Sequence, residues 1–175
     1  MVKFLKTNLF NVKNPKCNVG ADAGIDTFCP TYSEEFKKIF EEDNPGKTLE
    51  KDEKGYFISV GPQEDVLINS GLYTLLEKGT ALIAFNKSGV ARKQHLCKMA
   101  EVDDYSYEGL LHIHVVNTGK ESTKIYCDEK VVQWVQVKIA EGFEVFNESE
   151  ISKEEFFEGH IKDRGTGGFG STTLK

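Results

Sequence analysis

The stretch Leu111-His112-Ile113-His114-Val115 decides the fold class of this chain of 175 residues. Apolar and polar side chains alternate strictly along it, which is the period of a β-strand with one face toward a core. Because the apolar face must pack against something, the segment 109–116 predicts a strand in a sheet that faces a second sheet.

Similar runs of β-branched, aromatic and aliphatic residues precede and follow this stretch. They predict five further strands, at 56–60, 65–68, 80–85, 123–127 and 131–139. Turn-forming residues separate the runs, as in Val60-Gly61-Pro62, Asn69-Ser70-Gly71, Lys87-Ser88-Gly89 and Asn117-Thr118-Gly119-Lys120. Short strands at fairly even spacing predict an all-β barrel or sandwich.

Residues 31–55 read as an insertion in this β pattern. A short helix is predicted over 32–43, with Ser33 as its N-cap and with Phe36, Ile39 and Phe40 on one face. The polar run that follows, up to Gly55, predicts an exposed loop. A weaker helix is predicted over 148–157, with Ser149 or Ser152 as its cap.

Composition limits the kind of partner and the compartment. A net charge of -6 argues against an extended nucleic-acid surface. The four cysteines are scattered without a CxxC pair, which indicates reduced thiols rather than a zinc site or a disulfide framework. With no signal peptide or membrane span in the sequence, we expect a cytoplasmic protein without a membrane or nucleic-acid partner.

The segment Arg164-Gly165-Thr166-Gly167-Gly168-Phe169-Gly170-Ser171-Thr172 has a composition that no packed core requires. Backbone N–H groups of such a segment can point at phosphate oxygens, Arg164 can add a bidentate contact, and Phe169 can stack on a base. We expect one barrel domain over 1–160 and a mobile glycine-rich arm over 161–175 that orders on a nucleotide.

Five segments, in order, resemble the motifs of one family, the trimeric deoxyuridine triphosphatases (dUTPases). The glycine-rich arm is similar to the fifth motif. The first motif is resembled by Ala23-Gly24-Ile25-Asp26, and the second by Asn86-Lys87-Ser88-Gly89-Val90-Ala91. The third is resembled by Val102-Asp103-Asp104-Tyr105-Ser106-Tyr107-Glu108-Gly109, and the fourth by Lys130-Val131-Val132-Gln133-Trp134-Val135. The resemblance covers the chain from about residue 20 to 173, apart from the insertion.

The resemblance implies a β-barrel-like jelly roll of the β-clip type, assembled as a homotrimer whose active sites take residues from three subunits. It implies hydrolysis of dUTP to dUMP and pyrophosphate, with Mg²⁺ held by the substrate phosphates and water. It is also compatible with a protein that works in a virus-infected host cell.

By this resemblance, Asp104 is the catalytic base that orients the attacking water. Its register follows from Tyr107-Glu108-Gly109, although the neighbouring Asp103 leaves a one-residue slip open. Tyr107 matches the residue that stacks under the deoxyribose and excludes a 2′-hydroxyl.

The resemblance assigns the phosphates to Lys87, Ser88, Gly89 and Gln133, with Asp26 as an organiser of the site. Lys87 stands where the family usually has arginine, so a point charge replaces a bidentate fork. In the arm, the resemblance assigns Arg164 to the γ-phosphate, Phe169 to the base, and Gly167, Gly168, Gly170, Ser171 and Thr172 to the surrounding shell.

Alternatives remain open at this level. Glu101 stands where the family usually has glycine, in the hairpin that reads the base, so another pyrimidine deoxynucleotide such as dTTP, a 5-substituted dUTP or dCTP is a second candidate substrate. A dCTP deaminase would need a glutamate where this chain has His114. A non-catalytic nucleotide-binding protein is a third reading, and His112 and His114 read as surface or subunit-contact residues rather than metal ligands.

Overall fold

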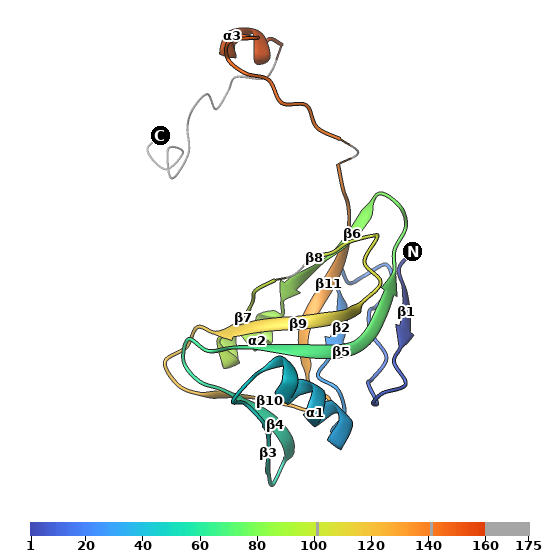
Figure 1. Ribbon diagram of the computed structural model, residues 1–175, viewed down its shortest axis with the longest axis vertical. Helices are drawn as coiled ribbons and strands as arrows, with labels where there is room; N and C mark the ends of the chain where they lie inside the picture. The colour runs from blue at the N-terminus through green and yellow to red at the C-terminus, as the bar shows by residue number, and fades with distance from the viewer. Residues whose placement is uncertain (101, 141, 160–175) are drawn as a thin grey trace. The chain divides into compact units, whose positions relative to one another are not determined.

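Three antiparallel sheets form the part of the chain from Met1 to Ala140 in the computed structural model, which describes residues 1–100, 102–140 and 142–159 (Figure 1). The first sheet has the order β1-β5-β9-β7, with β1 (Lys3–Lys6), β5 (Asp65–Leu75), β9 (Leu110–Asn117) and β7 (Leu96–Lys98). The second has the order β2-β11-β6-β8, with β2 (Ile25–Phe28), β11 (Lys130–Lys138), β6 (Thr80–Asn86) and β8 (Val102–Asp103). The third has the order β10-β4-β3, with β10 (Thr123–Tyr126), β4 (Gly55–Val60) and β3 (Leu49–Asp52). The predicted all-β class is confirmed.

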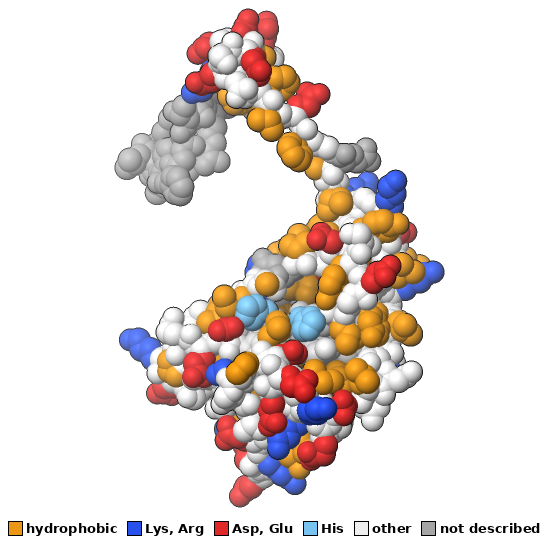
Figure 2. All heavy atoms as spheres, viewed as in Figure 1, with side chains coloured by type: hydrophobic (Ala, Val, Ile, Leu, Met, Phe, Trp, Pro, Cys, Tyr) orange, Lys and Arg blue, Asp and Glu red, His pale blue; other side chains and the backbone are white. Residues whose placement is uncertain are grey.

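The alternation along β9 places one of its faces in the core. Leu111, Ile113 and Val115 are at most 2% exposed, whereas His112 and His114 between them are partly exposed. Figure 2 shows histidine side chains among hydrophobic ones on the face formed by β5 and β9. The period-2 pattern therefore fixed which side of this strand faces the other sheets.

Strand β5 is longer than the sequence predicted. The predicted turn at Asn69-Ser70-Gly71 is instead a bulge inside the strand, where the pairing of β5 with β9 shifts between Asn69 and Tyr73. Gly71 has a φ of 71°, and a Cβ on it would lie 2.8 Å from the ring of buried Phe10. Glycine at this position thus lets the strand bend over the core without ending.

The predicted helical insertion is confirmed as α1 (Glu34–Asp43). The Ser33 side chain accepts a hydrogen bond from the Phe36 N–H, as a helix N-cap does, and Phe36 and Phe40 are buried. At the other end, the Asn44 side chain donates to the Leu67 carbonyl at 2.7 Å and accepts from the Leu67 N–H at 2.8 Å. Asn44 therefore ties the insertion to β5.

The expectation of an exposed loop up to Gly55 is wrong, because this segment contains β3. Strand β3 pairs antiparallel with β4, and Leu49 anchors it with only 6% of its surface exposed. Because charged residues follow Leu49, the composition of this segment does not predict a strand. Backbone pairing with β4 and one buried side chain are sufficient to order it.

The predicted turn at Lys87-Ser88-Gly89 is also wrong, because it begins a helix, α2 (Ser88–Gln94). Lys87 is the N-cap residue, and His95, with a φ of 55°, ends the helix in a left-handed conformation. The helix buries none of its residues, so its sequence has no apolar periodicity from which a helix could be predicted.

A second unit spans residues 141–175, and its described part holds α3 (Lys153–Phe156). The Ser152 side chain caps this helix in a capping box with Glu155. The helix lies inside the predicted range 148–157, and Ser152 is one of its two predicted caps. The Phe156 ring contacts the rings of Phe146 and Phe157 edge-on.

Within the described ranges, the helices are too short or too polar to cross a membrane.

Candidate active site

Asp26 lies between two lysines that come from different strand ends. The Lys87 Nζ, directly after β6, contacts its Oδ1, and the Lys130 Nζ, at the start of β11, lies 2.7 Å from its Oδ2. The Asp26 side chain is only 14% exposed. Because both carboxylate oxygens are engaged, Asp26 fixes the two ammonium groups at one end of the second sheet.

The electrostatics of this cluster favour the charged form of Asp26. Burial alone raises the pKa of the Asp26 carboxyl, but the hydrogen bonds from Lys130 and Lys87 outweigh it and lower the pKa below its usual value. Two lysines thus meet one carboxylate, which leaves an excess of positive charge for an anionic ligand.

Gln133 lies directly opposite Asp26, in the pairing of β11 with β2. Its side-chain amide donates to the Asn86 carbonyl at 3.1 Å. A Cβ on Gly24 would lie 2.5 Å from the Gln133 Oε1. Glycine at position 24 therefore allows the segment before β2 to approach Gln133 closely.

A hollow of about 490 Å³ opens beside this cluster, at the start of α2. Its lining residues are Lys87, Gly89, Val90, Lys93, Gln94, Glu129 and Lys130. Ser88 and Gly89 are exposed at its edge. Three lysines on one hollow make it suitable for phosphate groups.

A second group of candidate residues lies on the turn between β8 and β9. The Tyr107 N–H donates to the Asp104 carbonyl at 3.0 Å, which closes the turn, and the Tyr107 hydroxyl donates to the Leu110 carbonyl at 3.2 Å. A Cβ on Gly109 would lie 2.3 Å from the Tyr107 hydroxyl oxygen. Only glycine at position 109 lets the tyrosine ring fold over the backbone in this way.

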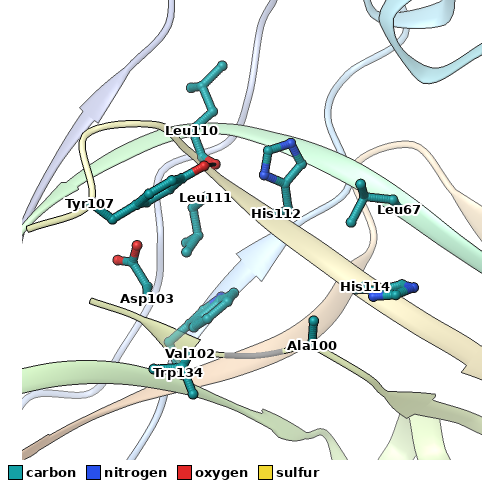
Figure 3. Close-up of a pocket in the computed structure, with 10 residues that line it drawn as sticks. All are labelled: Leu67, Ala100, Val102, Asp103, Tyr107, Leu110, Leu111, His112, His114 and Trp134. Carbon is teal, nitrogen blue, oxygen red and sulfur yellow. Dashed lines mark hydrogen bonds between the residues drawn. The ribbon is translucent and has the colours of Figure 1, made fainter. Parts of the chain in front are cut away.

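Tyr107 lines a mostly apolar pocket of about 140 Å³ between β8 and β9 (Figure 3). The pocket is lined by Leu67, Ala100, Val102, Asp103, Tyr107, Leu110, Leu111, His112, His114 and Trp134. In Figure 3 the Asp103 carboxyl and the Tyr107 ring lie at one end, with Ala100 and His114 at the other. An apolar pocket with a few polar groups is suited to a flat, partly polar ligand.

Asp103 and Asp104 are adjacent in sequence but differ in environment. Asp103 is 3% exposed; its Oδ2 lies 2.5 Å from the Thr74 hydroxyl, and its Oδ1 has no hydrogen-bond partner among the described residues. Burial raises the pKa of the Asp103 carboxyl. Asp104 is exposed, so it is the one of the two that can meet water and a ligand.

The histidines of β9 do not gather metal ligands in the part of the chain that the structure describes. His114 Nε2 lies 2.8 Å from the Asp65 Oδ2, and His112 lines the pocket. Three or more His, Cys, Asp or Glu side chains do not cluster in a metal-binding arrangement among these residues.

The two groups of candidate residues lie at opposite ends of β6. Asp103 pairs with Leu82 near the start of that strand, and Lys87 directly follows its end. The span from Leu82 to Lys87 is roughly 17 Å, at about 3.4 Å per residue of a strand. The Asp104 turn and the lysine cluster thus lie toward opposite ends of β6 on one chain.

The structure brings together Asp26, Lys87 and Gln133, and separately Asp104 and Tyr107, as described above. The predicted residues Arg164, Gly167, Gly168, Phe169, Gly170, Ser171 and Thr172 lie outside the described residues, as does Glu101. Lys130 was not singled out from the sequence. Its position three residues before Gln133, in the segment compared with the fourth motif, was the available signal.

Comparison with known sequences identifies relatives of this chain. The dUTPase family model matches residues 55–173. The deoxyuridine 5'-triphosphate nucleotidohydrolase of Clostridium acetobutylicum is 32% identical over 64% of this chain and 72% of its own length. The protein of the same name from Aromatoleum aromaticum is 29% identical over 66% of this chain and 73% of its own length.

Solved structures share the fold. A mutant of the dUTPase of Staphylococcus bacteriophage 80alpha with dUpNHpp matches with a TM-score of 0.68, at 20% identity over 98% of each chain. The dUTPase of EIAV matches with a TM-score of 0.58, at 16% identity over 86% of this chain and all of its own. A mutant dUTPase from Staphylococcus aureus phage phi11, described with a structural Mg(II) ion, matches with a TM-score of 0.63, at 19% identity over 85% of this chain and 97% of its own.

Proposed function

This chain is a member of the dUTPase family, and we propose that it hydrolyses dUTP to dUMP and pyrophosphate. The observation that carries the proposal is the family match over residues 55–173, which include Lys87, Asp104, Tyr107 and Gln133. The geometry supports it, because Lys87 lines a lysine-rich hollow and Tyr107 lines an apolar pocket.

Asp104 is the proposed general base. Hydrolysis of a phosphoanhydride requires a water aligned with the leaving group and a group that accepts its proton. Asp104 is an exposed carboxylate on a closed turn next to the Tyr107 pocket, so it can reach both solvent and a bound nucleotide. Asp103 is unsuited to this role because it is buried against Thr74.

Tyr107 is the residue proposed to stack against the deoxyribose. Its ring is held over Gly109 by the hydrogen bond to the Leu110 carbonyl, which leaves little freedom to move away. A fixed ring face against the deoxyribose excludes a 2′-hydroxyl by contact.

The phosphate end of the substrate belongs to the lysine cluster in this proposal. Lys87 and Lys130 supply positive charge, Ser88 and Gly89 offer a hydroxyl and backbone N–H groups, and Gln133 offers a side-chain amide. Asp26 positions both lysines and is an organiser of the site rather than a ligand of the substrate.

Mg²⁺ is the proposed cofactor and, when bound, neutralises charge on the triphosphate. The described residues fit an ion that arrives on the substrate, because Asp26 is occupied by the lysines and Asp103 is buried. Binding the phosphates, orienting the sugar and accepting the proton of water remain the tasks of the side chains named above.

The arm is the remaining part of the proposed site. Arg164 is proposed to meet the γ-phosphate and Phe169 to stack on the base. Gly167, Gly168, Gly170, Ser171 and Thr172 complete the shell around the nucleotide.

A homotrimer with shared sites is the proposed assembly. The Asp104 turn and the lysine cluster of one chain lie toward opposite ends of β6, roughly 17 Å apart along the strand, so one dUTP does not easily meet both in the same chain. A neighbouring subunit that supplies one of the two groups removes this difficulty.

The function is tested by measuring pyrophosphate release with Mg²⁺ from dUTP, dTTP, dCTP and UTP in parallel. We expect strong preference for dUTP, with UTP rejected because of its 2′-hydroxyl. Comparable or better hydrolysis of dTTP or dCTP would contradict the proposed substrate, and no release from any of the four would contradict the proposed activity.

A further inference from the structure

The thiols of Cys29 and Cys127 meet at the end of β2. The Cys29 N–H donates to the Glu129 carbonyl at 2.8 Å, and the Cys29 carbonyl accepts from the Asp128 N–H at 2.9 Å. Cys29 therefore pairs directly with the turn between β10 and β11, one residue beyond Cys127. The side chains of Cys29 and Cys127 are near enough to influence each other's ionisation.

This pair of thiols is held in place by its surroundings. The Thr31 hydroxyl donates to the Asp128 Oδ1 at 2.7 Å, and the Cys127 N–H donates to the Tyr56 carbonyl at 2.9 Å. These bonds fix the backbone on both sides of the contact. The segments that carry the two cysteines are therefore tied to each other by hydrogen bonds on both sides.

The two thiols differ in exposure and acidity. Cys29 is fully buried, and Cys127 is partly exposed. The interaction with Cys127, together with burial, raises the pKa of the Cys29 thiol well above its usual value, and the interaction with Cys29 lowers the pKa of the Cys127 thiol. Cys127 therefore ionises first and is the one that a reagent from solvent can reach.

We propose that Cys29 and Cys127 form a dithiol site that a small hydroperoxide, such as hydrogen peroxide, oxidises to a disulfide. The Cys127 thiolate attacks peroxide, so that an S–O bond forms, the O–O bond breaks and hydroxide leaves to become water. The Cys29 sulfur then attacks the Cys127 sulfur, so that the S–S bond forms, the S–O bond breaks and the Cys29 thiol proton leaves with the second water. Two electrons pass from the thiols to peroxide, which is reduced to two waters.

The other two cysteines have different neighbours. The Cys17 thiol is exposed and lies 3.7 Å from the Asp22 carbonyl oxygen, and the Cys97 sulfur lies 3.8 Å from the Thr118 hydroxyl. Cys97 serves as an internal control for oxidation that does not depend on a neighbouring thiol.

The disulfide joins two segments that already hold the lysine cluster. Asp26 lies in β2, which ends one residue before Cys29, and its partner Lys130 follows the turn that holds Cys127. The bond closes a loop of about 100 residues, which restricts the unfolded chain strongly. We expect oxidation to raise Tm by roughly 5–10 °C.

Peptide mapping tests the site directly. In the intact chain, Cys17 and Cys29 share the tryptic peptide 17–37, so the exposed Cys17 is first replaced in a Cys17→Ser background. Cys29, Cys127 and Cys97 then fall in the separate peptides 17–37, 125–130 and 94–98. After brief peroxide treatment, alkylation and digestion without reductant, we expect a linked pair of peptides 17–37 and 125–130 that dithiothreitol separates.

Cys127→Ser in the same background is the matched variant, because it removes the partly exposed thiol and leaves buried Cys29 in place. It should give no linked peptide and no rise in Tm on oxidation. Recovery of peptides 17–37 and 125–130 separately from the treated Cys17→Ser protein, or linkage of either one to 94–98, would overturn the proposal.

Discussion

Asp103 and Asp104, adjacent at the end of β8, differ in burial and therefore in what their carboxyl groups can do. The Asp103 side chain points inward to Thr74, while Asp104 is exposed on the turn that Tyr107 closes. A buried carboxyl resists ionisation, whereas an exposed one is accessible to water and to a ligand.

Replacement of the proposed base gives the first residue-scale prediction. Asp104→Asn should lower kcat by about 10²–10⁴-fold, because no carboxylate remains to accept the proton of the attacking water. Binding of dUpNHpp should be retained within a few fold, since the amide keeps the shape of the side chain. Steady-state hydrolysis and calorimetric titration measure the two quantities.

Asp103→Asn is the matched control, one residue away and of the same chemistry. It should keep most of the wild-type turnover. A large loss in this variant with near-normal turnover in Asp104→Asn would show that the register of the motif is shifted by one residue.

Asp103 also gives a prediction about stability and pH. Burial raises its pKa in the folded state, so the folded protein favours the protonated form. Stability from this group is complete below the unfolded-state pKa near 3.8 and is lost as pH rises through the raised folded-state pKa. Asp103→Asn removes this loss.

Urea unfolding of the wild type and Asp103→Asn between pH 4 and pH 8 measures the difference. The variant should gain stability relative to the wild type as pH rises, by on the order of 1 kcal/mol, the cost of one poorly satisfied buried group. A difference that is constant over this range would contradict a buried, proton-favouring Asp103.

At the scale of elements, the insertion α1 is an independently capped helix on a β framework. Its apolar side chains Phe36 and Phe40 are fully buried, and Asn44 ties its end to β5. Its contribution is to the stability of the framework, because none of the proposed site residues comes from it.

Ser33→Ala should therefore lower the free energy of unfolding by about 1 kcal/mol, the usual effect of losing a helix N-cap. Turnover of the folded enzyme should stay unchanged. Ser33→Asp, which keeps a capping oxygen, should recover most of the loss; equal destabilisation by both changes in urea unfolding would argue against a capping role.

Elements with a strong local pattern could be predicted from the sequence, and others could not. The alternation in β9 and the capped apolar face of α1 specify their structure locally. Strand β3 is ordered by pairing with β4, and β8 has only two residues. Such elements depend on contacts with distant segments, which composition does not reveal.

The same distinction applies to the candidate site. Asp26, Lys87 and Gln133 were identified by resemblance, and the structure brings them together. The second lysine, Lys130, follows from pairing of β2 with β11 and not from its own local sequence. The burial of Asp103, likewise, depends on Thr74 in a different strand.

At the scale of the whole molecule, the proposed active site takes its lysine cluster and its Asp104 turn from different subunits. Within a chain the two groups lie at opposite ends of β6. In a closed symmetric oligomer, the Asp104 turn of one subunit can lie next to the lysine cluster of its neighbour.

The most direct test mixes two variants that are impaired for different reasons, Asp104→Asn and Lys87→Gln, by co-expression with different tags. Tandem affinity purification isolates oligomers that contain both. If the site is shared, each mixed trimer holds one site that pairs an intact Asp104 from one subunit with an intact Lys87 from another, so about one third of its sites recover activity. If mixed oligomers hydrolyse dUTP no faster than the two parent variants, each site lies within one subunit and the account is contradicted.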